Sequence, residues 1–141
     1  MPRMKKRYRR MVDTRRLYKL EQEMYEDDRY LHLTKQRSYK YIIKMARDIW
    51  RNERIKTEMP KIRFGNGILH GNNRYSWCDG ETIELAVDQQ DIITLIHELV
   101  HGMGFDDHDA EFVKKEVRLL KKYAKLNKEL ISEAFETYDY N

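Results

Sequence analysis

Apolar residues recur with a helical period in four stretches of the chain. They trace one side of a helix at residues 12–33, 34–58, 109–124 and 130–138. Side chains three and four positions apart share a helical face, so each stretch can bury one face and leave the other in water. Pro60 marks the end of the second stretch, because proline cannot continue a helix. The pattern therefore predicts amphipathic helices at both ends of the chain.

The period changes to alternation in the middle of the chain. Residues 61–64, 68–69, 74–77 and 82–87 alternate as strands do, and turn residues rich in glycine and asparagine separate them. The last of these stretches places three apolar side chains on one side: Ile83, Leu85 and Val87. Short strands joined by tight turns favour a small antiparallel sheet.

The most apolar run follows these strands and predicts a buried central helix. Residues 92–100 are apolar over most of a helical circumference. Asp88 or Asp91 can cap this helix by accepting a hydrogen bond from a free N–H of its first turn. Glycines at positions 102 and 104 supply a stop. Together the elements predict one α+β domain in which a small antiparallel-rich sheet and flanking helices pack against this helix.

The remaining face of the central helix carries the HExxH pentad His97-Glu98-Leu99-Val100-His101. Residues four apart lie on one face about a turn from each other, so both imidazoles can reach a single zinc ion. His108, seven residues after His101, is the candidate for a third ligand. Glu98 lies beside the site, where it can deprotonate a water that zinc activates. The sequence thus predicts a Zn²⁺ site with Glu98 as general base.

Further groups around the metal are left open by the sequence. Three nearby carboxylates can orient a ligand imidazole: Asp106, Asp107 or Glu111. Three side chains can supply a second electrophilic group near the metal: Arg74, Tyr75 or Tyr123. An extended substrate is expected to pair with an exposed sheet edge at residues 74–77, which gives affinity through the backbone.

Composition places the chain among globular intracellular proteins. At 141 residues, with 40% hydrophobic and 37% charged residues, it is long enough for one core and too apolar for a disordered chain. No run approaches the roughly 20 apolar residues of a membrane span. The single cysteine, Cys78, cannot form an internal disulfide, so we expect a cytoplasmic protein, with a virion as a second setting.

Positive charge is concentrated at the N-terminus. Residues 1–20 contain nine Lys and Arg and only one acid, and so carry +8, whereas the whole chain carries +4. We expect a basic arm at residues 1–20 and a single domain, which holds the predicted zinc site, at residues 21–141. Such an arm, with Tyr8 and Tyr18 interleaved, can neutralise phosphates and stack on bases. A solvated tail and a docking segment for an acidic protein are the alternatives.

The HExxH helix, preceded by a strand and followed by a further helix, resembles a zincin metallopeptidase. Residues 108–112, His-Asp-Ala-Glu-Phe, resemble the His-Gly-Pro-Glu-Phe segment of the SprT-like (Spartan-like) proteases, in which the histidine is the third zinc ligand. The resemblance covers residues 60–125. It departs in two ways: SprT-like proteins usually place more residues between HExxH and this histidine, and many carry a C-terminal cysteine zinc module that this chain cannot make.

Two other families resemble the same stretch. The metzincin pattern HExxHxxGxxH fits with one residue added and would place Asp107 at the third ligand, but no methionine follows Met103 to form the methionine turn of that family. The YbeY-type metal-dependent endoribonucleases share the histidines and the Gly104-Phe105-Asp106 region, yet have glycine where this chain has Glu98. His108 is therefore the preferred third ligand.

The SprT-like resemblance implies a zinc-dependent metallopeptidase that hydrolyses protein or peptide substrates, with nucleic-acid-associated proteins as candidates. His97, His101 and His108 would be its metal ligands and Glu98 its catalytic base. A YbeY-like endoribonuclease is the alternative enzyme. A zinc-stapled nucleic-acid-binding or virion assembly protein is the non-catalytic alternative. The sequence leaves the oligomeric state open.

Overall fold

The computed structural model describes the backbone of residues 6–124 and 127–136, with side chains for residues 15–124 and 127–135. The first five residues of the basic arm and Tyr138 lie outside the described residues. The described chain is α+β. Its helices are α1 (Lys6–Glu26), the 3-10 turn η1 (Asp28–Tyr30), α2 (Leu31–Thr34), α3 (Tyr39–Asn52), α4 (Ile92–Gly102), α5 (Ala110–Tyr123) and α6 (Lys128–Glu136). Its strands are β1 (Lys61–Gly65), β2 (Ile68–His70), β3 (Asn73–Tyr75), β4 (Trp77–Cys78) and β5 (Thr82–Ala86).

The sheet is mixed, so the antiparallel expectation was only partly right. In the three-stranded sheet, β5 lies between β1, which is parallel to it, and β4, which is antiparallel. The turn after β1 does not fold the chain back as a hairpin. Gly67, at φ +70°, donates its N–H to Glu84 Oε2 at 3.0 Å, and the chain leaves the sheet there. Strands β2 and β3 instead pair with each other as a separate antiparallel hairpin.

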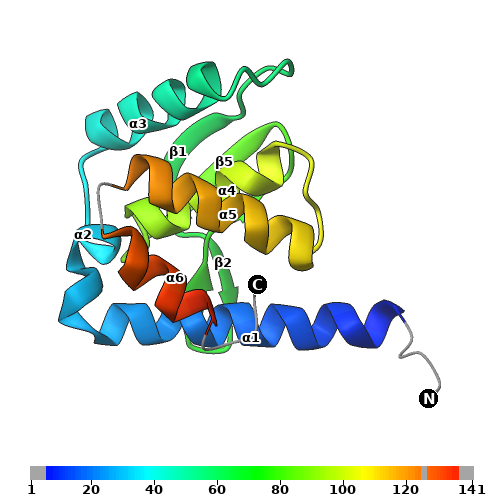
Figure 1. Cartoon of the computed structure of the whole chain (residues 1–141). Coiled ribbons are helices and arrows are strands. Elements are labelled where there is room, and N and C mark those ends of the chain that lie inside the picture. Colours follow the sequence, from blue (N-terminus) through cyan, green and yellow to red (C-terminus); the bar gives the residue numbers. More distant parts are fainter. Residues whose placement is uncertain (1–5, 125–126, 137–141) are drawn as a thin grey trace.

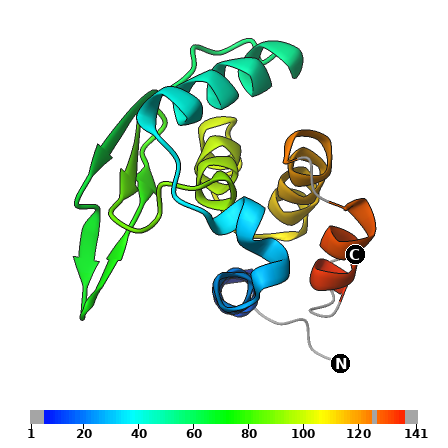
Figure 2. The same ribbon diagram turned by 90° about the vertical axis from the view of Figure 1, so that its left-hand side faces the viewer.

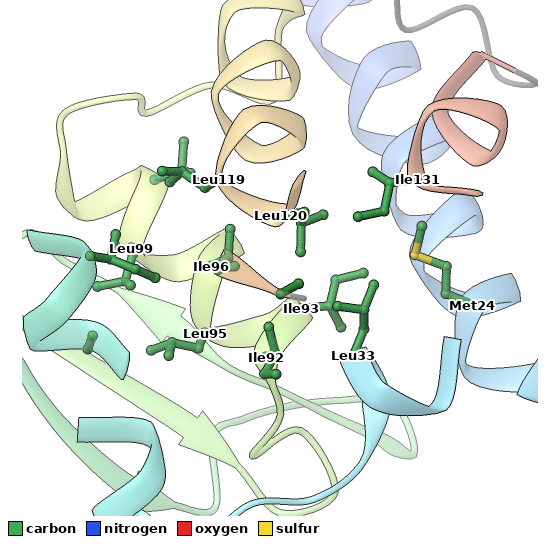
Figure 3. Packing of buried hydrophobic residues seen from close by; sticks show 14 of the residues in the cluster. Met24, Leu33, Ile92, Ile93, Leu95, Ile96, Leu99, Leu119, Leu120 and Ile131 are labelled. Atoms are coloured by element: carbon green, nitrogen blue, oxygen red, sulfur yellow. The ribbon is translucent and has the colours of Figure 1, made fainter. Parts of the chain in front are cut away.

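Helix α4 is the centre of the molecule. Figure 2 shows α4 between the sheet and α5, with α3 across one end. Ile92, Ile93, Leu95, Ile96 and Leu99 are all buried, and Figure 3 shows them packed against side chains of α1, α2, α5 and α6. A helix that is apolar around most of its circumference has to be covered on most sides. Val87 does not join this core: it lies just past β5 and is 52% exposed, contrary to expectation.

Both ends of α4 have the expected signals. Asp91 is the N-cap, and its Oδ1 accepts a hydrogen bond from Thr94 N at 2.8 Å. Gly104 has φ +107°, a backbone conformation that favours glycine, and turns the chain away after Met103. The chain that follows returns toward α4 before α5 begins, and this return places His108.

Helix α1 continues beyond residue 20, where the sequence predicted the end of the basic arm. Its side chains Leu17, Leu20 and Met24 are buried in the core, so the expected boundary at residue 20 falls inside a helix that packs on the domain. The predicted helix over residues 12–33 is interrupted, because Asp27 caps a new turn by accepting from Arg29 N. In Figure 1, α1 runs along one side of the molecule and its N-terminal turns extend beyond the other elements.

None of the helices in the described ranges combines the length and the apolar character that crossing a membrane requires.

Candidate metal centre

Three histidines from α4 and the following loop converge on one point. His97 and His101 are four residues apart on α4, and the loop after Gly104 brings His108 opposite them. His108 Nε2 lies 3.0 Å from His97 Nε2 and 2.9 Å from His101 Nε2. The residues predicted from the sequence as ligands therefore present the same ring nitrogen to one another.

The far side of two of these rings is already hydrogen-bonded. His97 Nδ1 donates to Glu21 Oε1 at 2.8 Å, and His101 Nδ1 donates to the backbone oxygen of Phe105 at 2.8 Å. A proton held on Nδ1 leaves a lone pair on Nε2 in a neutral imidazole. The partners thus select the tautomer in which Nε2 is the free ligand atom.

The ring of Phe112, from the first turn of α5, supports all three imidazoles. Its centroid lies 4.9 Å from that of His97, 4.6 Å from that of His101 and 4.9 Å from that of His108. Asp109 starts this helix by accepting a hydrogen bond from Phe112 N at 3.0 Å. The cap of α5 therefore fixes the ring beneath the histidines, and the three imidazoles have little room to turn.

The three histidines differ in their ionisation. Burial and the charges of His97 and His101 lower the pKa of His108 to about 3. Burial and His97 also lower the pKa of His101. Burial acts in the same direction on His97, but Glu21 and Glu116 outweigh it and raise the pKa of His97 well above its ordinary value. Nitrogen lone pairs this close repel one another unless a proton or a metal ion lies between them, so the three residues can hold a metal.

Glu98 lies beside this cluster and is almost completely buried, with 6% of the residue exposed. Its Oε2 has no hydrogen-bond partner among the described residues. Burial is the main reason that the pKa of Glu98 is raised, while the nearby charge of His97 acts in the opposite direction. A buried carboxylate oxygen without a partner is costly unless it serves a ligand or a reaction.

His97 and Glu98 line a cavity of about 690 Å³. Helix α1 forms one wall, and the β2–β3 hairpin with its following residues forms the other. The lining residues from α1 are Tyr18, Glu21, Gln22 and Tyr25; those from the other wall are Asn72 to Ser76. Gln89 fixes this second wall, since it accepts from Ser76 N at 2.9 Å and donates to Arg74 O at 3.1 Å.

Two of the three candidate electrophiles reach the cavity. Arg74 and Tyr75 both line it. Tyr123 lies elsewhere, because its hydroxyl donates to Glu53 Oε2 at 2.7 Å in a contact between α5 and α3. Tyr18, which the sequence did not single out for this role, also lines the cavity and packs against His108, with ring centroids 5.3 Å apart.

The carboxylates at His97 come from unexpected positions. Glu21 belongs to α1, and Glu116 of α5 brings Oε1 to 3.6 Å from His97 Nδ1. Burial, and then Glu21, raise the pKa of Glu116 to about 8. Glu116 had a sequence signal: it occupies a core position of the amphipathic helix that also carries Val113 and Leu120. Glu21 had none, because nothing local connects it with residue 97.

The other acids expected near the metal have different surroundings. Glu111 is exposed on α5 and pairs with Lys114 at 3.9 Å. Two groups of described residues lie close enough to share a metal ion, namely the three histidines and the set Glu21, His97 and Glu116. Asp106 and Asp107 are in neither group, so the structure brings His108 rather than Asp107 to the other two histidines.

No protein-family model, curated protein or solved structure matches the chain. The support for a metal centre comes from the converging Nε2 atoms, their hydrogen-bonded far sides and the buried carboxylate beside them.

Proposed function

We propose that the protein is a zinc-dependent metallopeptidase of the zincin type, similar to the SprT-like proteases. One observation carries the proposal: three imidazole Nε2 atoms converge beside Glu98, whose buried carboxylate opens onto a cavity. Three neutral nitrogen ligands with a further position open are the pattern of catalytic zinc sites. A zincin requires that arrangement and a general base next to it.

Zinc bound by His97, His101 and His108 would supply a Lewis acid for the peptide carbonyl and would lower the pKa of water. Glu98 accepts a proton from the water that attacks the carbonyl carbon. It then gives this proton to the amide nitrogen as the C–N bond breaks, so that a carboxylic acid and an amine result.

The cavity provides the binding cleft for an extended peptide. Strand β4 is the edge of the three-stranded sheet, and β3 forms part of the cavity wall. Backbone groups at such an edge can pair with a peptide strand and give affinity without strong side-chain selectivity. Arg74 and Tyr75 both line the cavity and are the candidates to bind substrate carbonyl groups.

The substitution Glu98→Gln tests the function directly. The amide keeps the size of the side chain but cannot accept the proton, so we expect kcat for casein cleavage to fall roughly 100- to 10,000-fold. Zinc content, measured by atomic absorption, should remain that of the wild type. A Glu98→Gln protein that still cleaves casein at the wild-type rate contradicts the assignment of Glu98 as base.

An endoribonuclease is the second candidate, and the exposed basic side of α1 favours it. Arg15, Arg16 and Lys19 are all exposed there. Wild-type protein should be incubated in parallel with casein, a DNA-bound protein and a structured RNA. Cleavage of RNA but not of protein would contradict the proposed peptidase function and support the endoribonuclease function. Cleavage of neither would leave a zinc-stapled binding or assembly protein.

A further inference from the structure

A hydrogen bond connects helix α1 with the proposed metal centre. His97 Nδ1 donates to Glu21 Oε1 at 2.8 Å across a sequence separation of 76 residues. The Glu21 side chain is mostly buried, so the bond is shielded from water and from salt. The first histidine of the pentad is therefore held by an element that lies far upstream of the pentad.

The position of Glu21 is fixed by the packing of its own helix. Leu17, Leu20 and Met24 are buried on the same side of α1 and hold the backbone against the core. One helical turn after Glu21, the hydroxyl of Tyr25 donates a hydrogen bond to Oδ2 of Asp91, the N-cap of α4, at 2.5 Å. Helix α1 is thus attached to α4 at two points, through Glu21 and through Tyr25, and Glu21 has little freedom to leave His97.

A second carboxylate lies close to the same nitrogen. Glu116 of α5 is completely buried, and neither of its oxygens has a hydrogen-bond partner among the described residues. Its Oε1 lies 3.6 Å from His97 Nδ1, slightly beyond hydrogen-bond distance. With carboxylates of α1 and α5 both close to Nδ1, the ring of His97 is held with Nε2 toward His101 and His108.

We propose that Glu21 is a positioning residue of the metal centre, so that docking of α1 and binding of the metal strengthen each other. The inference rests on the metal site of the proposed function, and it assigns to α1 a part in that site. Carboxylates that hold a ligand imidazole commonly contribute 10- to 100-fold to metal affinity. By linkage, a metal that binds the docked form more tightly must also stabilise docking by the same factor.

The test compares Glu21→Gln and Glu21→Ala with Glu26→Gln, which removes a carboxylate from an exposed position of the same helix. Zinc affinity is measured by competition with a chromophoric chelator. We expect Glu21→Ala to bind zinc about 10- to 100-fold more weakly, Glu21→Gln to be intermediate because its amide oxygen still accepts a hydrogen bond, and Glu26→Gln to match the wild type. Thermal unfolding in excess chelator reports whether each variant keeps its fold.

Hydrogen exchange gives the reciprocal measurement. Zinc should slow amide exchange in residues 17–25 of the wild type and should slow it less in Glu21→Gln. This variant retains the shape of the side chain, so the measurement can be made even if Glu21→Ala does not fold. Equal zinc affinity in the wild type and in folded Glu21 variants would overturn the inference, whatever their peptidase activity. A wild type that binds zinc but cleaves no peptide would contradict the proposed function and leave this inference intact.

Discussion

The ring of Tyr18 packs edge-on against His108 and faces His97 at a centroid distance of 6.2 Å. Tyr18 lines the same cavity as His97, Glu21, Glu98 and Tyr75, and the charges of these residues influence the pKa of its hydroxyl. Burial raises the pKa of this phenol, so it remains protonated and can donate a hydrogen bond. Tyr18 is therefore the α1 side chain best placed to stabilise negative charge on a substrate carbonyl oxygen.

The substitution Tyr18→Phe should lower kcat for peptide cleavage by about 100-fold, because one donor to the developing oxyanion is lost while the ring remains. KM and zinc content should change little. Steady-state kinetics on Tyr75→Phe provides the comparison, since Tyr75 projects from the opposite wall of the same cavity. Full activity in Tyr18→Phe would show that the oxyanion is stabilised elsewhere.

The residues that could be predicted from the sequence are those whose relation is local. Positions 97 and 101 must share a face on any helix, and His108 follows within one short loop. Glu21 could not be predicted, because its contact with His97 depends on how α1 packs against α4. The roles of the three histidines as metal ligands and of Glu98 as base stay predictions, whereas the proximity of the histidines is a feature of the structure.

At the scale of elements, Glu53 joins α3 to α5. Its side chain is only 3% exposed and is surrounded by Lys115, Arg118 and Lys122. Burial acts to raise the pKa of Glu53, but hydrogen bonds from Lys122, Tyr123 and Arg118 outweigh it and lower the pKa to about 2. A carboxylate with a depressed pKa stabilises the fold above its unfolded-state pKa, and this stabilisation is lost as the pH falls toward 2.

Glu53→Gln should reduce the free energy of unfolding by about 2 kcal/mol at pH 7, because charged hydrogen bonds to three partners are weakened. The difference from the wild type should shrink as the pH is lowered from about 4.5 toward 2. Urea unfolding at several pH values measures it, with Glu58→Gln as a control at an exposed position of the same segment. If the difference in the free energy of unfolding does not change with pH, the lost stability comes from packing of the side chain and not from its charge.

The hydrophobic pattern predicted where the strands lie better than it predicted which strands pair. Alternation located β1 and β5, but their parallel pairing joins Ile62 with Ile83 and Phe64 with Leu85 across an excursion that contains a hairpin. Turn signals describe only a few neighbouring residues, so they favoured an antiparallel return after β1. The pairing of β1 with β5 depends on burial of the sheet against α4, and a local sequence pattern holds no information about that contact.

For the whole molecule, the distribution of charge suggests where a polyanion would bind. Leu17 and Leu20 of α1 face the core, while Arg15, Arg16 and Lys19 are exposed on its other sides. Deleting residues 1–20 would also remove Tyr18 and two core residues. Side-chain substitution is therefore the cleaner way to examine nucleic-acid binding.

A triple variant with Arg15, Arg16 and Lys19 replaced by glutamine should bind nucleic acid more weakly. The magnitude of the slope of log affinity against log salt should fall by about 2 on single strands and by nearly 3 on duplex DNA, as expected for three lost phosphate contacts. Fluorescence anisotropy with labelled RNA and DNA over a range of salt measures it. The control replaces three exposed cations of α3: Lys40, Lys44 and Arg47. Equal slopes in both variants and the wild type would remove α1 from the binding surface.

The bond between Glu21 and His97 also has a consequence for biosynthesis. A ribosome completes α1 long before it reaches the pentad, and Glu116 follows later still. Contacts between residues this far apart in the chain form late, because the loop between them must first be closed. The nascent protein therefore passes through a stage in which α1 lacks its partners, and the cluster of histidines and carboxylates can form only after the chain has been extended past Glu116.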